Sequence, residues 1–255
     1  MGGIYLKIVK YKKSTKGRYI VYFDNDVEKY IYEEVILKYD LLLKKNIDDK
    51  LFVLINDYNR ECEVYYTALD LIKNRARSIY DLKCVLLNKF DDTNLIELAI
   101  GKLIKQGYLN DSNYAKSYIY TQMVTTNKGP LKIENELSNK RIDSDIIANE
   151  LKVYSNSSQI SKIKKIVDKS IKSNHSKGGS VLKRKIVNNL LNLGYDYSLI
   201  QNVVNEYSFV NNDVIAKKEY EKLYKRYSKK YDGVELERIL KEKMYLKGLT
   251  YEKED

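Results

Sequence analysis

The spacing of apolar residues separates a short N-terminal part with strand-like patterns from a longer part with helical ones. Residues 4–11 and 18–23 are rich in Ile, Val and Tyr, and the Ser-Thr-Lys-Gly segment at 14–17 supplies turn formers between them. A turn at 24–26 and a third short strand at 28–31 follow. This part therefore predicts a β-hairpin with one added strand.

Helices are predicted from about Tyr32 onward, because apolar residues recur three and four positions apart. One helix begins at the Asp48–Asp49 pair, and the segment 64–72 is helical as well. Beyond residue 75 every predicted element is an amphipathic helix. Pro130 is the single proline in 255 residues, which favours long helices over a loop-rich all-β fold.

One apolar pattern recurs along the helical part. Apolar residues four positions apart form a helix face, a Gly able to adopt positive φ ends the helix, and the next apolar residue returns to the core. In the second copy Arg141 replaces this Gly, which we expect to weaken the helix stop there. Three copies of full length begin 53 and 54 residues apart, and an earlier copy (Leu82, Leu86, Phe90) is one residue shorter. The three copies of full length are Ile133, Leu137, Arg141, Ile142; Ile186, Leu190, Gly194, Tyr195; and Leu240, Met244, Gly248, Leu249.

A second and a third helix follow each of the first three copies. The second helices open with Asp caps and are predicted at 92–105, 143–151 and 196–207; the third are predicted at 111–126, 157–173 and 212–229. A three-helix module buries little surface alone, so we expect a mainly α protein of tandem repeats stacked in a curved solenoid. The expected divisions are 1–74 for the N-terminal hairpin and helices, 75–127, 128–177 and 178–231 for full repeats, and 232–255 for a truncated fourth.

The charge predicts attraction to polyanions, with nucleic acid first. Lys and Arg number 46 against 35 Asp and Glu, giving +11. The total alone is weak evidence, since Lys, Ile, Asn and Tyr are plentiful throughout. Residues 162–185 are more specific, with nine basic residues and one acid. The interface candidates on one face of the helix at 157–173 are Lys162, Lys165, Lys169 and Lys172; a merely solvated face is the alternative.

Two smaller basic groups are further candidates for contact with phosphate or an acidic protein surface. Arg75 and Arg77 precede Ser78, which has the character of a helix N-cap. The alternative is that the two arginines simply lie before the start of that helix and bind nothing. Lys183, Arg184 and Lys185 lie on the first helix of the third repeat.

No catalytic constellation is found. His175, the only histidine, lies in a predicted linker, and Cys62 and Cys84 are far apart in the sequence. The acidic pairs Glu33-Glu34, Asp48-Asp49 and Asp91-Asp92 could suggest a metal-dependent nuclease, but two of them precede helix starts, where carboxylates act as caps. We therefore expect no enzyme, no metal and no cofactor. Two cysteines, no apolar run of membrane-spanning length and no visible signal peptide favour a cytoplasmic protein that does not insert into a membrane. We expect a monomer.

Four segments follow one another in a recognisable order. They are Ala68-Leu69 with Arg75-Ala76-Arg77-Ser78; Gly107-Tyr108-Leu109-Asn110-Asp111 with Tyr114-Ala115; Lys128-Gly129-Pro130 with Ile133, Glu136-Leu137, Lys140 and Ile142; and Leu190 with Gly194-Tyr195 and 197–203. Together these segments resemble the RecX family of regulatory proteins. Ala76 stands where that family usually has Pro, and Arg141 stands where it has Gly; a Gly is also missing near Phe90.

The resemblance implies a non-enzymatic modulator of the RecA recombinase. Such proteins bind RecA and its filament on single-stranded DNA, and usually inhibit strand exchange, ATP hydrolysis and coprotease activity, which connects them to homologous recombination, DNA repair and the SOS response. The rival reading is a stand-alone helix-turn-helix regulator of duplex DNA, although one recognition helix needs no repeated solenoid.

Overall fold

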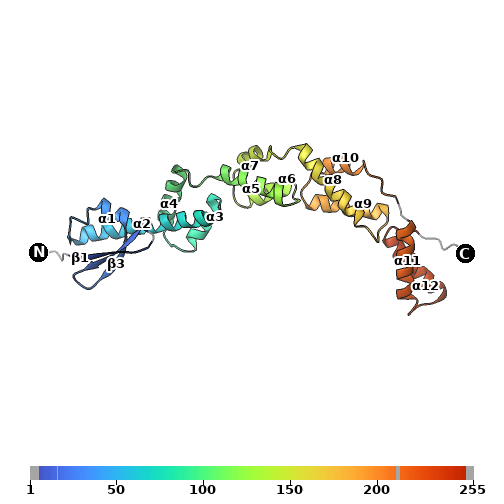
Figure 1. Ribbon diagram of the computed structural model, residues 1–255, viewed down its shortest axis with the longest axis horizontal. Coiled ribbons are helices and arrows are strands. Elements are labelled where there is room, and N and C mark those ends of the chain that lie inside the picture. The colour runs from blue at the N-terminus through green and yellow to red at the C-terminus, as the bar shows by residue number, and fades with distance from the viewer. Residues whose placement is uncertain (1–5, 16, 211–212, 251–255) are drawn as a thin grey trace. The chain divides into compact units, whose positions relative to one another are not determined.

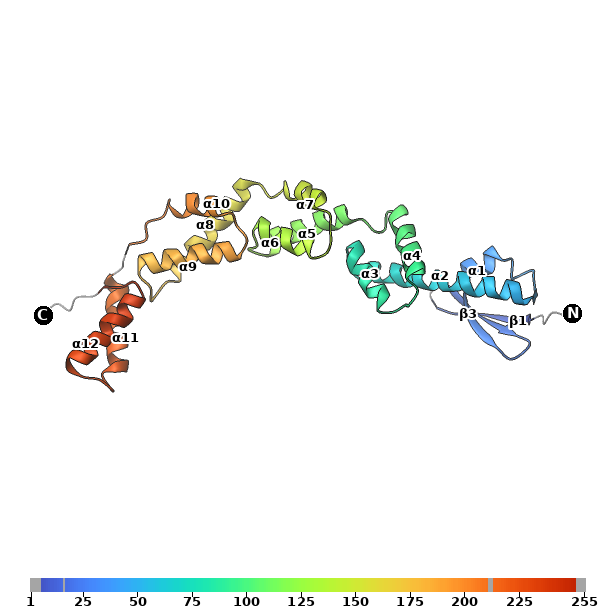
Figure 2. The same ribbon diagram turned by 180° about the vertical axis from the view of Figure 1, so that it is seen from behind.

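The computed structural model describes residues 6–15, 17–210 and 213–250, drawn in Figures 1 and 2. The chain divides into two compact units, one of Met1–Tyr114 with Lys140–Ile142 and the other of Ala115–Asn139 with Asp143–Asp255. Each unit has its own buried apolar residues, and each is described by itself below.

The first unit begins with a four-stranded antiparallel sheet in the order β3-β2-β1-β4. The predicted hairpin and third strand are confirmed, although Ile4, Tyr5 and Lys16 lie outside the described residues. The fourth strand was not predicted, since it has only two residues and exists through pairing of Ile47 with Leu6. The strands are β1 (Leu6–Lys13), β2 (Arg18–Phe23), β3 (Glu28–Tyr32) and β4 (Asn46–Ile47).

A short helix α1 (Glu33–Lys38) and a 26-residue helix α2 (Asp49–Asn74) follow the sheet. The Asp48 carboxylate caps α2 by accepting from the Leu51 amide at 2.7 Å. Two predicted helices are thus one, because no Gly or Pro interrupts the chain between them. Ile55 and Cys62 of α2 pack into the core of the sheet, whereas Val64, Tyr65 and Ala68 belong to the next core.

Ten further helices are present among the described residues. They confirm the predicted three-helix repetition, with bounds shifted by a few residues. Asn212, at the start of one predicted helix, lies outside the described part. The helices are α3 (Ile79–Leu87), α4 (Thr93–Lys105), α5 (Asp111–Thr125), α6 (Pro130–Ser138), α7 (Ser144–Leu151), α8 (Asn156–Lys172), α9 (Gly179–Asn192), α10 (Tyr197–Val204), α11 (Asp213–Tyr227) and α12 (Gly233–Leu246).

The buried clusters group a long helix with the short helices that follow it. One cluster joins the second half of α2 to α3 and α4, another joins α8 to α9 and α10, and a third joins α11 to α12. The expected ranges 75–127, 128–177 and 178–231 place the long helix last instead. The period is the same in both groupings, and those ranges, like the curvature of the stack, stay predictions.

The positive φ predicted for the Gly position is confirmed at Gly194 and Gly248, and Arg141, expected to weaken the helix stop, adopts positive φ as well. The backbone φ is +57° at Arg141, +86° at Gly194 and +67° at Gly248. In the short first copy α3 ends on Asn88, which has ordinary right-handed helical geometry. Arg141 therefore occupies a conformation that glycine adopts at lower cost.

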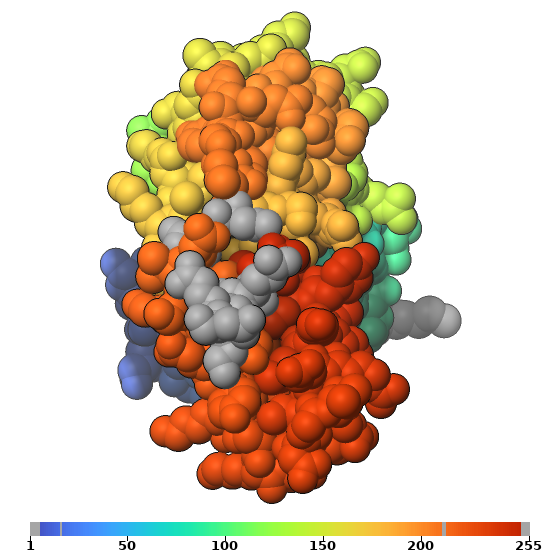
Figure 3. All heavy atoms as spheres, turned by 90° about the vertical axis from the view of Figure 1, so that its right-hand side faces the viewer, coloured from blue at the N-terminus to red at the C-terminus, as the bar shows by residue number. Residues whose placement is uncertain are grey.

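The residues at these helix ends bond to the start of a helix in a neighbouring repeat. In the second unit the Gly129 amide donates to the Leu193 carbonyl oxygen at 2.6 Å, and the Gly178 amide donates to that of Lys247 at 2.8 Å. The surface of α12 adjoins that of α9 in Figure 3. These bonds satisfy backbone groups that both helix ends would otherwise leave unpaired.

The same kind of contact occurs in the first unit. Ser78 is fully buried and caps α3, since its Oγ accepts from the Asp81 amide at 3.1 Å. That hydroxyl also donates to the Lys140 carbonyl oxygen at 3.3 Å, and the Lys140 Nζ lies 2.5 Å from Asp81 Oδ2. Ser78 therefore caps α3 and also contacts Lys140, which lies 62 positions later in the chain.

Three residues of the segment from Gly107 to Asp111 each have a structural role. Gly107 has φ +76° just after α4, and Leu109 returns to the core with 2% exposure. The Asp111 carboxylate then accepts from the Ile79 amide at 2.9 Å, although burial raises its pKa. The segment ends one helix and fixes the start of another.

Candidate functional site

The strongest candidate surface is on α8. Ser155 caps this helix, and Ile163, Ile166 and Val167 form its buried face. The side chains of Lys165, Lys169 and Lys172 are exposed on the opposite side, as the spacing predicted. Within the described part of the chain, no hydrogen bond or ion pair occupies these three ammonium groups. Three cations thus share one accessible helix face.

Lys162 lies at the border of that face and is used inside the fold. Its Nζ donates to the carbonyl oxygens of Met123 and Thr126, the latter at 2.9 Å, and lies 5.3 Å from the centre of the Tyr154 ring. Burial, with the neighbouring Lys165, lowers its pKa. Lys162 therefore stabilises the C-terminal end of α5, where carbonyls attract a cation.

The other basic residues of the 162–185 stretch also divide into those that are paired within the protein and those that are exposed. Lys164 pairs with Glu206 at 2.7 Å, and Lys183 donates to the Asn205 side chain at 3.0 Å. Arg184 and Lys185 are exposed on α9. The surface available to an external anion is thus smaller than the sequence suggested, because several charges are used inside the protein.

Arg75 and Arg77 belong to the first unit. Arg75 is exposed, directly after α2. Arg77 is partly buried, and its Nε donates to the Leu71 carbonyl oxygen at 3.4 Å. One terminal nitrogen of Arg77 is buried without a hydrogen-bond partner among the described residues. Arg75 is therefore the more accessible of the two.

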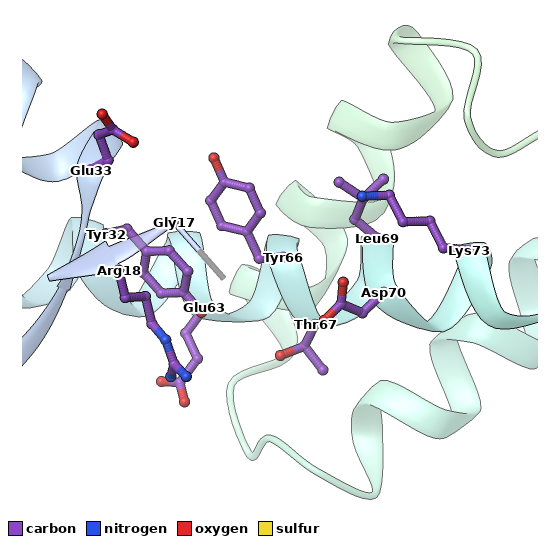
Figure 4. Close-up of a pocket in the computed structure, with 10 residues that line it drawn as sticks. All are labelled: Gly17, Arg18, Tyr32, Glu33, Glu63, Tyr66, Thr67, Leu69, Asp70 and Lys73. Atoms are coloured by element: carbon purple, nitrogen blue, oxygen red, sulfur yellow. The ribbon is translucent and has the colours of Figure 1, made fainter. Parts of the chain in front are cut away.

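A pocket of about 360 Å³ between the sheet and α2 was not foreseen from the sequence (Figure 4). The Arg18 guanidinium lies 5.9 Å from the Tyr32 ring, which stacks on Tyr66 with ring centres 4.9 Å apart. The pocket's three carboxylates outnumber its two cations, so it disfavours an anionic ligand. The charged lining residues are Arg18, Glu33, Glu63, Asp70 and Lys73.

The Glu34 carboxylate joins three helices of the first unit. It accepts hydrogen bonds from Tyr58 at 2.8 Å and Tyr66 at 3.3 Å, and Lys102 lies 3.3 Å away. Burial alone would raise the pKa of Glu34, but the bonds from Tyr58 and Lys102 lower it overall. Burial and this carboxylate also raise the pKa of Tyr66 to about 12. The group is a structural network of α1, α2 and α4.

Possible metal ligands are not clustered in the part of the chain that the structure describes. No group of three or more His, Cys, Asp or Glu side chains is arranged there to hold a metal ion. Cys62 is buried and Cys84 partly buried, and both are free thiols. No described helix is both long and apolar enough to cross a membrane.

Comparison with known proteins connects this geometry to one family. Residues 110–151 match the profile described as RecX, second three-helix domain, and correspond to α5, α6 and α7. A regulatory protein RecX of Streptococcus sanguinis is 29% identical over 251 residues, covering 96% of each chain. That of Halalkalibacterium halodurans is 27% identical over 253 residues, covering 96% of this chain and 95% of the relative.

Solved structures agree with these sequence matches. A crystal structure of a regulatory protein RecX is similar with a TM-score of 0.67 and 24% identity, over 78% of this chain and 99% of that one. RecX from Lactobacillus salivarius is similar with a TM-score of 0.54 and 29% identity, over 57% of this chain and 95% of that one. RecX proteins are regulatory and not enzymatic. Over nearly its whole length the chain is therefore similar to regulatory proteins of the RecX family, and it shares the fold of a solved RecX structure.

Proposed function

We propose that this protein binds the RecA filament on single-stranded DNA and lowers its ATPase, strand-exchange and coprotease activities. The family assignment supports the choice of RecA as partner. The observation that carries the DNA part is the row of exposed, unpaired cations on α8 (Lys165, Lys169 and Lys172). Cations spaced along a surface attract the regularly spaced phosphates of a nucleic acid.

The proposed interface of the second unit extends beyond α8 to Arg184 and Lys185 on α9, and Arg75 is a separate candidate contact on the first unit. Lys162, Lys183 and Arg77 make internal hydrogen bonds, so in this proposal they act by positioning the surface. The protein would act as a monomer in the cytoplasm, during recombination, DNA repair and the SOS response.

The test compares four binding targets over a salt series: the RecA filament, RecA alone, bare single-stranded DNA and duplex DNA. We expect the filament to be bound most tightly, its ATPase rate to fall, and affinity to weaken as salt rises. Sequence-specific binding to duplex DNA, with no change in RecA ATPase, would instead support a stand-alone helix-turn-helix regulator.

A further inference from the structure

A polar pocket of about 300 Å³ lies between the end of α8, the loop that follows it and one face of α9. It is separate from the exposed lysine row of α8. Its lining contains no carboxylate, in contrast to the pocket beside the sheet. The lining residues are Ser170, Ser173, Asn174, His175, Ser176, Lys177, Leu182, Lys185, Ile186 and Asn189.

The pocket lies between α8 and α9, just beyond the apolar part of the interface between these two helices. Ile163, Ile166 and Val167 fill the inner face of α8, and Ser170 and Ser173 follow on that same face. On α9, Lys185 and Asn189 lie beside the buried Ile186. Polar groups thus replace apolar ones where the two helices still face each other.

The loop that closes the pocket is fixed by its own hydrogen bonds. The Asn174 side chain donates to the Lys177 carbonyl oxygen at 2.8 Å and accepts from the Lys177 amide at 3.1 Å. One residue later, the Gly178 amide donates to the Lys247 carbonyl oxygen at 2.8 Å. A ligand therefore meets a preformed wall, which reduces the entropy lost on binding.

Donor groups point to an anionic ligand. In the described residues, no hydrogen bond or ion pair occupies the side chains of His175, Ser176, Lys177, Lys185 or Asn189. The two ammonium groups give the lining a charge of at least +2. The hydroxyls of Ser170 and Ser173 donate to carbonyls of their own helix, so they are already used. The free donor groups of the pocket are therefore those of the five residues named above.

We propose that this pocket binds a phosphate group of single-stranded nucleic acid. The assignment rests on the proposed function, because it gives one phosphate of the bound strand a defined site. Two ammonium groups and neutral donors around a preformed cavity match the charge and the several acceptor oxygens of a phosphate. Lys172 is exposed one residue before Ser173, so the α8 lysine row leads toward the same end of the helix.

The test follows the backbone amide NMR signals of Ser176 and Lys177 in the full-length protein during titration with inorganic phosphate, and separately with a short oligo-dT. We expect saturable shifts with each, and competition between them. Lys185→Gln should weaken both interactions about ten-fold, as expected when one charge-assisted contact is lost. Lys217→Gln is the matched control, because Lys217 is an exposed lysine of α11 outside the pocket.

Asn189→Leu removes a donor without changing net charge and should also weaken phosphate binding. Shifts that never saturate, or equal losses in Lys185→Gln and Lys217→Gln, would overturn the proposal. Saturation by phosphate that oligo-dT cannot displace would assign the pocket to a free anion and contradict the nucleic-acid assignment. The effect of the protein on RecA ATPase and its binding to the filament are measured separately. If the protein inhibits RecA but phosphate does not saturate the pocket, only the pocket proposal is rejected. If phosphate saturates the pocket but the protein does not bind the filament, only the proposed function is rejected.

Discussion

Gly129 and Gly194 touch through their backbones. A Cβ atom placed on Gly129 would lie 2.4 Å from the Gly194 carbonyl oxygen, and the Gly129 amide donates to Leu193. The Leu131 amide bonds to Gly194 at 3.1 Å, so two backbone bonds join the start of α6 to the end of α9. Only glycine at position 129 permits this approach without a clash.

Gly129→Ala should therefore destabilise the second unit. We expect the free energy of unfolding to fall by about 2 kcal/mol or more, because the new methyl group meets rigid backbone. Urea denaturation followed by circular dichroism measures the change. Gly101→Ala is the control: Gly101 lies within α4 with open space around it, and this substitution should raise stability by up to about 1 kcal/mol. Equal stability of Gly129→Ala and the wild type would show that the contact yields easily.

Substitution of Lys162 and of Lys165 should distinguish a lysine that stabilises the fold from one that binds the filament. Lys162→Met removes the cation that caps α5, and we expect stability to fall by about 1–3 kcal/mol, as for hydrogen bonds to charged groups. Lys165→Met should leave stability within about 0.5 kcal/mol, because Lys165 is exposed, and should weaken filament binding. Thermal unfolding and filament pull-down on the same two proteins measure both effects. A reversed pattern would contradict the assignment of roles.

The lysine row of α8 is tested by the triple substitution of Lys165, Lys169 and Lys172 to Gln. If each contacts one phosphate, the slope of log affinity against log salt for single-stranded DNA should shrink by about 2, at roughly 0.7 per contact. Folding should be unchanged, since these side chains are exposed. An unchanged salt slope would identify the row as a solvated face.

Glu34 should make stability depend on acidity. Its pKa in the folded protein lies below the ordinary value of 4.5, so its contribution is present above that pH and is lost as pH falls through the lowered value. Glu34→Gln should destabilise the first unit at pH 7 and flatten the loss of stability in acid. Unfolding curves between pH 3 and 7 test this in comparison with Glu33→Gln, which changes an exposed neighbour. Matching curves for the two variants would rule out the network.

Local rules account for the parts of the fold that the sequence predicted. Asp92, Asp143 and Asp196 cap α4, α7 and α10 through hydrogen bonds within a few residues, so their positions can be read from spacing alone. The positive φ at Gly194 and Gly248 follows from the same short-range chemistry. The hairpin, the 53-residue period and the family resemblance needed nothing more.

Tertiary structure decided which charges are available and where cavities form. Lys162 and Lys165 look equivalent in a helical repeat, yet only Lys162 bonds to the carbonyl of Thr126, which lies 36 residues earlier, directly after the end of α5. The strand β4 exists only because Ile47 meets Leu6. The α8–α9 pocket likewise needs Ser170 and Asn189 on facing helices. Sequence periodicity fixes which face of a helix a residue occupies, whereas the partner of that face depends on contacts between distant residues, which only the folded chain defines.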